Sequence, residues 1–214
     1  MSVERVIRLI IVKLPYGDKI KLHYILLLKG KFTMKKYLKG FANLGFFEVL
    51  TNTLSAYVCG TDRTTLIGAS SCAPTDNKTD FSIPADDGIY DSGSDWTDTT
   101  LVITVLEADL ANLAQLIGAE FDTELKEGTF DEPNEVALTF SALRRDGGYR
   151  LYRYFCCKCT GYKVTHNTKG TNNDAQSYEL TFKCTPRKCD NLIRTTKDID
   201  KGETLTYIDS MEDA

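Results

Sequence analysis

The sequence predicts a mainly β protein of antiparallel strands, in a β-sandwich or barrel-like arrangement, with one flanking α-helix. Three observations favour this fold class. Residues 178–184 alternate apolar and polar side chains, which is the period of a strand with one buried face. Asp146-Gly147-Gly148 is a hairpin turn signal between two apolar runs. Only residues 106–117 place apolar side chains at helical spacing, so helices are few and neighbouring strands are antiparallel.

The first strands are expected directly after Lys39. Residues 41–50, FANLGFFEVL, form a strand candidate rich in Phe and Leu, and a turn at 51–53 leads to a short strand at 54–59. The stretch from Leu66 to Phe81 is polar and weakly patterned, which predicts a long, exposed hairpin or loop. Ala85–Gly88 follows as a turn, because Asp accepts local backbone hydrogen bonds and Gly tolerates positive φ.

A strand and a helix are expected next. Thr99 to Leu106 contains a β-branched run that suits a buried strand. The helix that follows has its apolar stripe at Leu106, Leu110, Leu113 and Ile117. Glu107 and Asp109 are expected in its first turn, where the helix dipole favours anions, and Gly118 is placed to end it.

The second half of the chain predicts more strands. Residues 121–134 are acidic and turn-rich, as in a surface connection, and Val136, Leu138 and Phe140 alternate with smaller residues in a half-buried strand. A long aromatic strand returns from Tyr149 to Thr160, and residues 166–174 form a loop before the strand at 178–184.

The charge distribution suggests three regions. Residues 1–33 carry seven basic and two acidic residues, a net charge of +5, and the remaining 19 basic and 28 acidic residues leave −9. We expect residues 1–33 to be a translated leader or a disordered N-terminal extension, because Met34 looks like a start; a genuine β-arm that clasps a neighbour is the alternative. Residues 34–198 are expected to form one domain, and residues 199–214 an acidic, flexible tail. The apolar runs of residues 1–33 are too short to span a bilayer.

The cysteines are the strongest candidates for a metal or redox site. Cys156 and Cys159 have C-x-x-C spacing, and Cys184 and Cys189 could complete a set of four zinc ligands. If the strands on either side of residues 166–174 pair, Cys159 lies opposite Cys184 and Cys156 opposite Cys189, so zinc or a disulfide is possible. Strand alternation, however, points Cys156 and Cys159 to opposite faces. We therefore predict buried, reduced thiols, Cys157 included, and no metal.

Other chemistry has weaker support. His166 alone would have to serve a Cys-His or Ser-His pair, and it lies in a polar loop. Asp86, Asp87, Asp91, Asp95 and Asp98 lack the spacing of an EF-hand and are better explained as turn residues. The basic residues Arg144, Arg145, Arg150 and Arg153, beside Tyr149, Tyr152 and Tyr154, could stack on nucleic acid, but salt bridges to an adjacent subunit fit an acidic protein better. We thus expect no enzyme activity, no cofactor and no catalytic residue.

Several segments resemble, in order and spacing, the major tail protein (tail tube) family of long-tailed, siphovirus-type phages. They are ADDGIYDSG (Ala85–Gly93), LVITVLEADLANLAQLIG (Leu101–Gly118), GAEFD (Gly118–Asp122), EVALTFSALRRDGGYRLYRYF (Glu135–Phe155) and SYELTFKCTPR (Ser177–Arg187). The resemblance covers residues 39 to 198.

This resemblance implies a structural virion protein that is made in a bacterial host cytoplasm. Its subunits would self-assemble into stacked hexameric rings, the hollow tail conduit for genome ejection, in which the stretch from Leu66 to Phe81 contacts the neighbouring ring. The implied partners are the tape-measure, tail terminator and baseplate proteins. DNA would pass through the lumen without specific binding, and no membrane is involved. The alternative is a monomeric β-sandwich ligand-binding module.

Overall fold

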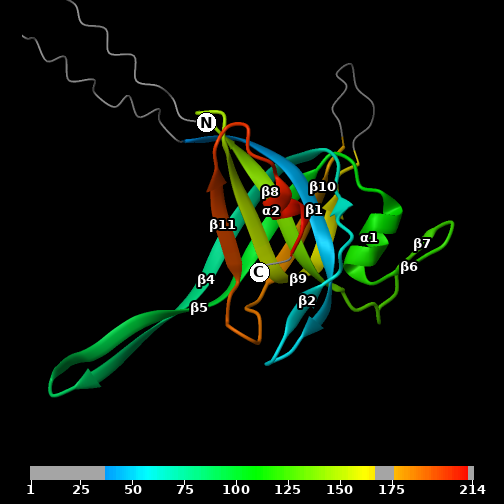
Figure 1. Cartoon of the computed structure of the whole chain (residues 1–214). Helices are drawn as coiled ribbons and strands as arrows, with labels where there is room; N and C mark the ends of the chain where they lie inside the picture. Colours follow the sequence, from blue (N-terminus) through cyan, green and yellow to red (C-terminus); the bar gives the residue numbers. More distant parts are fainter. Residues whose placement is uncertain (1–36, 167–175, 212–214) are drawn as a thin grey trace, which may run out of the picture. The chain divides into compact units, whose positions relative to one another are not determined.

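The computed structural model describes residues 37–166 and 176–211, which belong to one compact unit. The expectations for residues 1–33 lie outside this described part. A nine-stranded antiparallel sheet dominates the described residues (Figure 1). Its strands are β1 (Leu38–Asn52), β2 (Tyr57–Cys59), β3 (Thr64–Thr65), β4 (Ala69–Ala85), β5 (Gly88–Val105), β8 (Glu135–Arg144), β9 (Tyr149–Val164), β10 (Tyr178–Cys184) and β11 (Arg194–Ile199). A small second sheet pairs β6 (Glu120–Phe121) with β7 (Leu125–Lys126), and the helices are α1 (Leu110–Ile117) and α2 (Thr206–Asp209). The predicted mainly β fold with a flanking helix is confirmed.

The main sheet curls into a barrel-like body. Its strands follow the order β2-β1-β8-β9-β10-β5-β4, and β9 is long enough to pair with β11 and β10 in succession along one edge. The chain after β3 brings the β4 end of this path beside β1. The N–H of Leu66 donates to the carbonyl of Leu44 in β1, and from Ala69 onward the chain pairs with β5. Gly68, with φ of 75°, makes the turn between these two pairings.

The apolar side chains inside the curled sheet form one core. Its larger members come from five strands and from α1: Leu44, Phe46, Leu101, Ile103, Leu113, Leu116, Leu138, Phe140, Tyr154, Leu180 and Phe182. Because a period of two alternates side chains across each strand, the same sequence pattern that predicted the strands also selects this inward face.

Helix α1 is shorter at its start than the sequence predicts. The N–H of Leu106 donates to the carbonyl of Gly68 directly after β5, so Leu106 is not part of the helix, and Asp109 caps the helix through the N–H of Ala111. Leu106 and Leu110 of the predicted stripe are therefore half-exposed. The predicted end at Gly118 is confirmed, with φ of 74° and its N–H bonded to the carbonyl of Ala114.

Strand β8 is buried on both faces, although the alternation predicted a half-buried strand. Its second face carries small polar side chains that have partners from other elements. Thr139 accepts a hydrogen bond from Arg63, and Ser141 accepts one from Asn43. Helix α2 contacts both β8 and β9. Small hydroxyl side chains thus allow close packing on a face that the sequence pattern assigns to solvent.

The C-terminal residues differ from the expected flexible tail. Within the predicted tail, Ile199 is the last residue of β11, and Ile208 of α2 is fully buried in a second cluster with Leu151 and Ile199. Arg153 holds the segment by donating to the carbonyls of Tyr207 and Ser210, at 2.6 and 2.7 Å. The buried Ile199 and Ile208 explain why this acidic segment packs on the body as far as the described residues extend, to residue 211. Residues 212–214 lie outside the described part.

Candidate assembly surface

Strands β4 and β5 form a hairpin that extends beyond the barrel-like body (Figure 1). We call residues 77–98, its projecting part, the arm. Pairing continues from Ala69 opposite Val105 in the body to Ala85 opposite Gly88 at the tip. Asp86 and Asp87 make the turn with φ of 45° and 64°, as a two-residue hairpin turn requires. The exposed hairpin and the turn are confirmed, although β5 begins at Gly88, well before the predicted Thr99.

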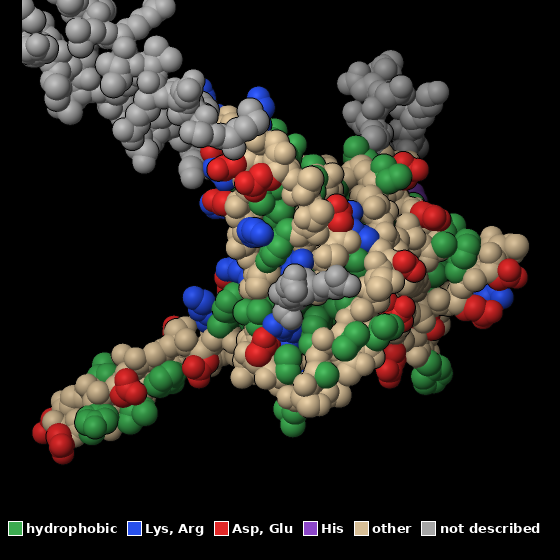
Figure 2. All heavy atoms as spheres, viewed as in Figure 1, with side chains coloured by type: hydrophobic (Ala, Val, Ile, Leu, Met, Phe, Trp, Pro, Cys, Tyr) green, Lys and Arg blue, Asp and Glu red, His purple; other side chains and the backbone are tan. Residues whose placement is uncertain are grey.

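Exposed apolar side chains gather near the tip of the arm. Phe81, Ile83, Ile89 and Tyr90 are 40%, 50%, 72% and 81% exposed. The whole β4–β5 hairpin has seven Asp and one Lys, and Figure 2 shows acidic and hydrophobic side chains together at its far end. Large apolar side chains in such a position mark a surface that contacts another molecule.

The arm also carries an open strand edge. Within the described residues β4 ends the strand order, so its outer edge has no strand partner. Such an edge can accept a strand from another chain. Pro74 and Pro84 lack the N–H that a ladder needs, so the edge available for pairing is the segment between them.

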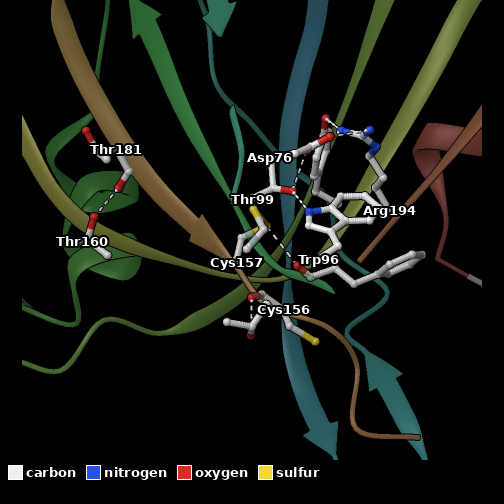
Figure 3. The surroundings of a disulfide bond; sticks show 12 residues. Asp76, Trp96, Thr99, Cys156, Cys157, Thr160, Thr181 and Arg194 are labelled. Atoms are coloured by element: carbon white, nitrogen blue, oxygen red, sulfur yellow. Dashed lines mark hydrogen bonds and ion pairs between the residues drawn. A yellow bond between two sulfur atoms is a disulfide. The ribbon is translucent and has the colours of Figure 1, made fainter. Parts of the chain in front are cut away.

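A polar cluster lies where the arm leaves the body (Figure 3). Arg194 of β11 donates from both terminal nitrogens to the two carboxylate oxygens of Asp76 in β4, each at 3.0 Å. Thr99 donates to Asp76 at 2.8 Å, and the indole N–H of Trp96 donates to Thr99 at 3.1 Å. The Arg194 guanidinium lies 4.8 Å from the centre of the Trp96 ring. Burial would lower the pKa of Arg194, but Tyr154 and Asp76 outweigh burial and raise it.

The cysteines pair differently from the prediction. Cys157 and Cys184 form a disulfide, so the expectation of reduced thiols is wrong for these two. Cys184 lies opposite Cys157, and Cys159 lies opposite Phe182. The ladder begins one residue away from the expected register, with Tyr178 opposite Val164, and an irregularity between Thr181 and Phe182 shifts it by one residue more.

The other cysteines remain thiols. Cys59, Cys72, Cys156 and Cys159 are buried or half-buried, and Cys189 is exposed. Burial raises the pKa of Cys72 to about 12 and that of Cys159 to about 11, which makes both weak nucleophiles. In the parts of the chain that the structure describes, no three His, Cys, Asp or Glu side chains gather as a metal site.

The other residues that the sequence singled out for catalysis, metal binding or nucleic-acid binding lie in different parts of the chain. His166 is exposed, with its Nδ1 3.3 Å from Gln176 Oε1. The five Asp residues of the predicted turn lie along the arm. The four arginines have partners within their own chain: Arg144 pairs with Asp146, Arg150 with Asp198, and Arg145 and Arg153 stack on Tyr37 and Tyr207. The expected salt bridges to an adjacent subunit stay a prediction. Asp76, Trp96 and Arg194 were missed, since no local motif joins positions 118 residues apart.

The fold and its surface thus define a β-barrel-like protein with a projecting hairpin. No protein-family model and no curated protein matches this sequence. One solved structure to which the chain is similar comes from the 6-fold symmetrised cryo-EM structure of the anti-feeding prophage (AFP) baseplate. The two chains are 6% identical, and the similarity covers 79% of this chain and 100% of that chain at a TM-score of 0.37. Neither helix of the described residues has the length and hydrophobicity to span a lipid bilayer.

Proposed function

We propose that this protein is a structural subunit of a phage tail, the major tail tube protein, and that it self-assembles into stacked hexameric rings. The observation that carries the proposal is the arm, which exposes apolar side chains and an open strand edge outside a complete core. The sequence segments that resemble tail tube proteins, from Ala85 to Asp122 and again from Glu135, support the same assignment.

The arm provides the contact between subunits. Burying a large apolar side chain completely contributes roughly 1.5–3 kcal/mol. Burial of the four apolar side chains near the tip can therefore contribute a binding free energy of several times RT. The cost of association has to be subtracted from this contribution. The open β4 edge adds backbone hydrogen bonds, so that the arm of one subunit can join a neighbouring subunit.

The charge of the protein suits a conduit for nucleic acid. Residues 34–214 carry a net charge of −9, and the β4–β5 hairpin alone contributes −6. Phosphate is repelled by such a surface, and tight binding of duplex DNA needs clustered Lys and Arg. A tube of these subunits would let DNA slide during genome ejection. In this role the protein is located in the virion, needs no catalytic site, and meets the tape-measure, terminator and baseplate proteins.

Shortening the arm tests the proposal. Replacing residues 82–92 by Asn-Gly keeps the Phe81–Gly93 pair and supplies a two-residue hairpin turn. We expect this variant to fold, as measured by circular dichroism, and to remain as separate subunits or rings when concentrated. The wild type should lengthen into tubes under negative-stain electron microscopy.

Phe130→Ser is the matched control, because Phe130 is 96% exposed but lies in the connection after β7. It should lengthen as the wild type does. A wild type that stays monomeric at high concentration would instead indicate a ligand-binding module, and normal tubes from the shortened variant would exclude the arm as the contact.

A further inference from the structure

A cross-strand row connects the disulfide to the base of the arm. Cys157 in β9 lies opposite Cys184 in β10, Cys184 lies opposite Thr99 in β5, and Thr99 lies opposite Asp76 in β4. Directly opposite residues point to the same face of a sheet. Cys157, Cys184 and Thr99 are all fully buried, so the row runs inside the body and reaches its margin at Asp76.

Arg194, from a separate strand, binds Asp76 at the end of this row. It belongs to β11, which pairs with β9 and not with the arm. Its two bonds to Asp76 form a fork-like, charge-assisted pair, the geometry that fixes direction as well as distance. Both groups are about one-third exposed, at 31% and 28%. Arg194 also donates to the Tyr154 hydroxyl at 3.3 Å, which ties the guanidinium to the body.

The cluster lies beside the point at which the arm can bend. Asn77 pairs with Asp98 but Lys78 pairs with Trp96, so Thr97 is an extra residue in β5. Such a bulge bends and twists a two-stranded ribbon. An isolated hairpin is also only marginally ordered by itself. The direction of the arm therefore depends on contacts at its base.

We propose that Arg194 and Asp76 clamp the base of the arm and fix the direction in which it leaves the body. Trp96 packs against the guanidinium from the arm side of the bulge, and the buried Cys157–Cys184–Thr99 row anchors Asp76 from the other side. Arg194 is a positioning residue, since it acts on the arm through Asp76 and Trp96. Its effect on tube formation rests on the proposed function, whereas the clamp itself does not.

The chain contains its own probe for this clamp, because Trp96 is its only tryptophan. Acrylamide quenching and fluorescence anisotropy of Trp96 would be measured on dilute, unassembled protein. Arg194→Ala should raise the quenching constant by about twofold or more, because losing the clamp lowers local order at the arm base. Arg194→Lys keeps the charge but not the fork, so an intermediate value is expected.

Arg150→Ala is the matched control. Arg150 makes the same kind of forked pair with Asp198 in the same β9–β11 ladder. It should leave the Trp96 signal unchanged. Asp76→Asn supplies a second test that keeps the shape of the side chain, and circular dichroism shows whether each variant is folded.

The outcomes separate the two proposals. Wild-type quenching in folded Arg194→Ala, or in Asp76→Asn if the former does not fold, would overturn the clamp. A mobile Trp96 together with normal tubes would overturn its role in assembly. A wild type that forms no tubes would count against the proposed function, yet the fluorescence comparison would still decide the clamp.

Discussion

Two glycines with similar backbone conformations have different surroundings. Gly118 has φ of 74° and Gly202 has φ of 93°, both in the left-handed region that disfavours other residues. A Cβ atom at Gly118 would lie 1.9 Å from the carbonyl oxygen of Glu132, whereas one at Gly202 would have no neighbour within 4 Å. Gly118 therefore serves two purposes, since it ends α1 and admits the backbone that leads into β8.

Gly118→Ala should be clearly more destabilising than Gly202→Ala. A non-glycine residue in the left-handed region costs about 1–2 kcal/mol, and both variants incur this cost. Only Gly118→Ala must also displace the backbone at Glu132. Urea unfolding followed by circular dichroism should show at least twice the loss of unfolding free energy for Gly118→Ala. Equal losses would mean that the loop at Glu132 moves freely.

Single residues also show where sequence reasoning fails. Gly118 could be assigned from its position after an apolar stripe, because helix ends have local signals. The partner of Cys184 could not, because it depends on where the ladder begins and on one irregularity within it, and neither has a local sequence signal. The cluster of Asp76 and Arg194 has no local signal at all, since it depends on where two distant strands lie.

At the scale of elements, the strands that pack on the core were predictable, whereas the extent of the arm, β11 and α2 were not. Strand β10 alternates clearly because one face packs on the core. The arm has no core to face, so β4 lacks alternation and reads as polar. Strand β11 and helix α2 are short. Each has few apolar side chains that pack on the body, and the acidic residues around them make this apolar pattern hard to recognise in the sequence. Helix α1 was found by its stripe, but its first turn was misplaced because Leu106 bonds to Gly68.

The corrected start of α1 changes which substitution should unfold the protein. Leu113→Asp places a carboxylate at a position that is 2% exposed, which costs several kcal/mol because the charge is desolvated. Leu110→Asp, on the same predicted stripe but 44% exposed, should be tolerated and adds a favourable charge at the helix start. Thermal unfolding should show a large loss for the first variant and a small change for the second. Similar melting temperatures for the two variants would contradict this position of α1.

At the scale of the whole molecule, the body is one continuous sheet, and its stability depends on the joints between strands. Residues 64–69 join β1 to β5, β11 pairs with the edge of β9, and α2 contacts β8 and β9. The sequence could indicate a sandwich or a barrel-like arrangement but could not choose between them, because the choice depends on pairings between distant strands. The Cys157–Cys184 disulfide adds a covalent link at the β9–β10 joint.

Reducing this disulfide should weaken the whole body. The link closes a loop with a sequence separation of 27, which restricts the unfolded chain. Removing a disulfide of this kind typically costs about 2–4 kcal/mol. We expect the urea midpoint of the wild type to fall when a phosphine reductant is added. The double variant Cys157→Ala, Cys184→Ala should be less stable from the start and should not respond to the reductant.

Cys189→Ser controls for general effects of reduction, because Cys189 is an exposed thiol that forms no disulfide. It should respond to the reductant as the wild type does. Since Cys184 lies opposite Thr99 in the row that leads to Asp76, reduction should also increase the acrylamide quenching of Trp96, though less than Arg194→Ala does. A urea midpoint that is the same with and without reductant would show that the β9–β10 joint gains its stability from packing and hydrogen bonds rather than from the disulfide.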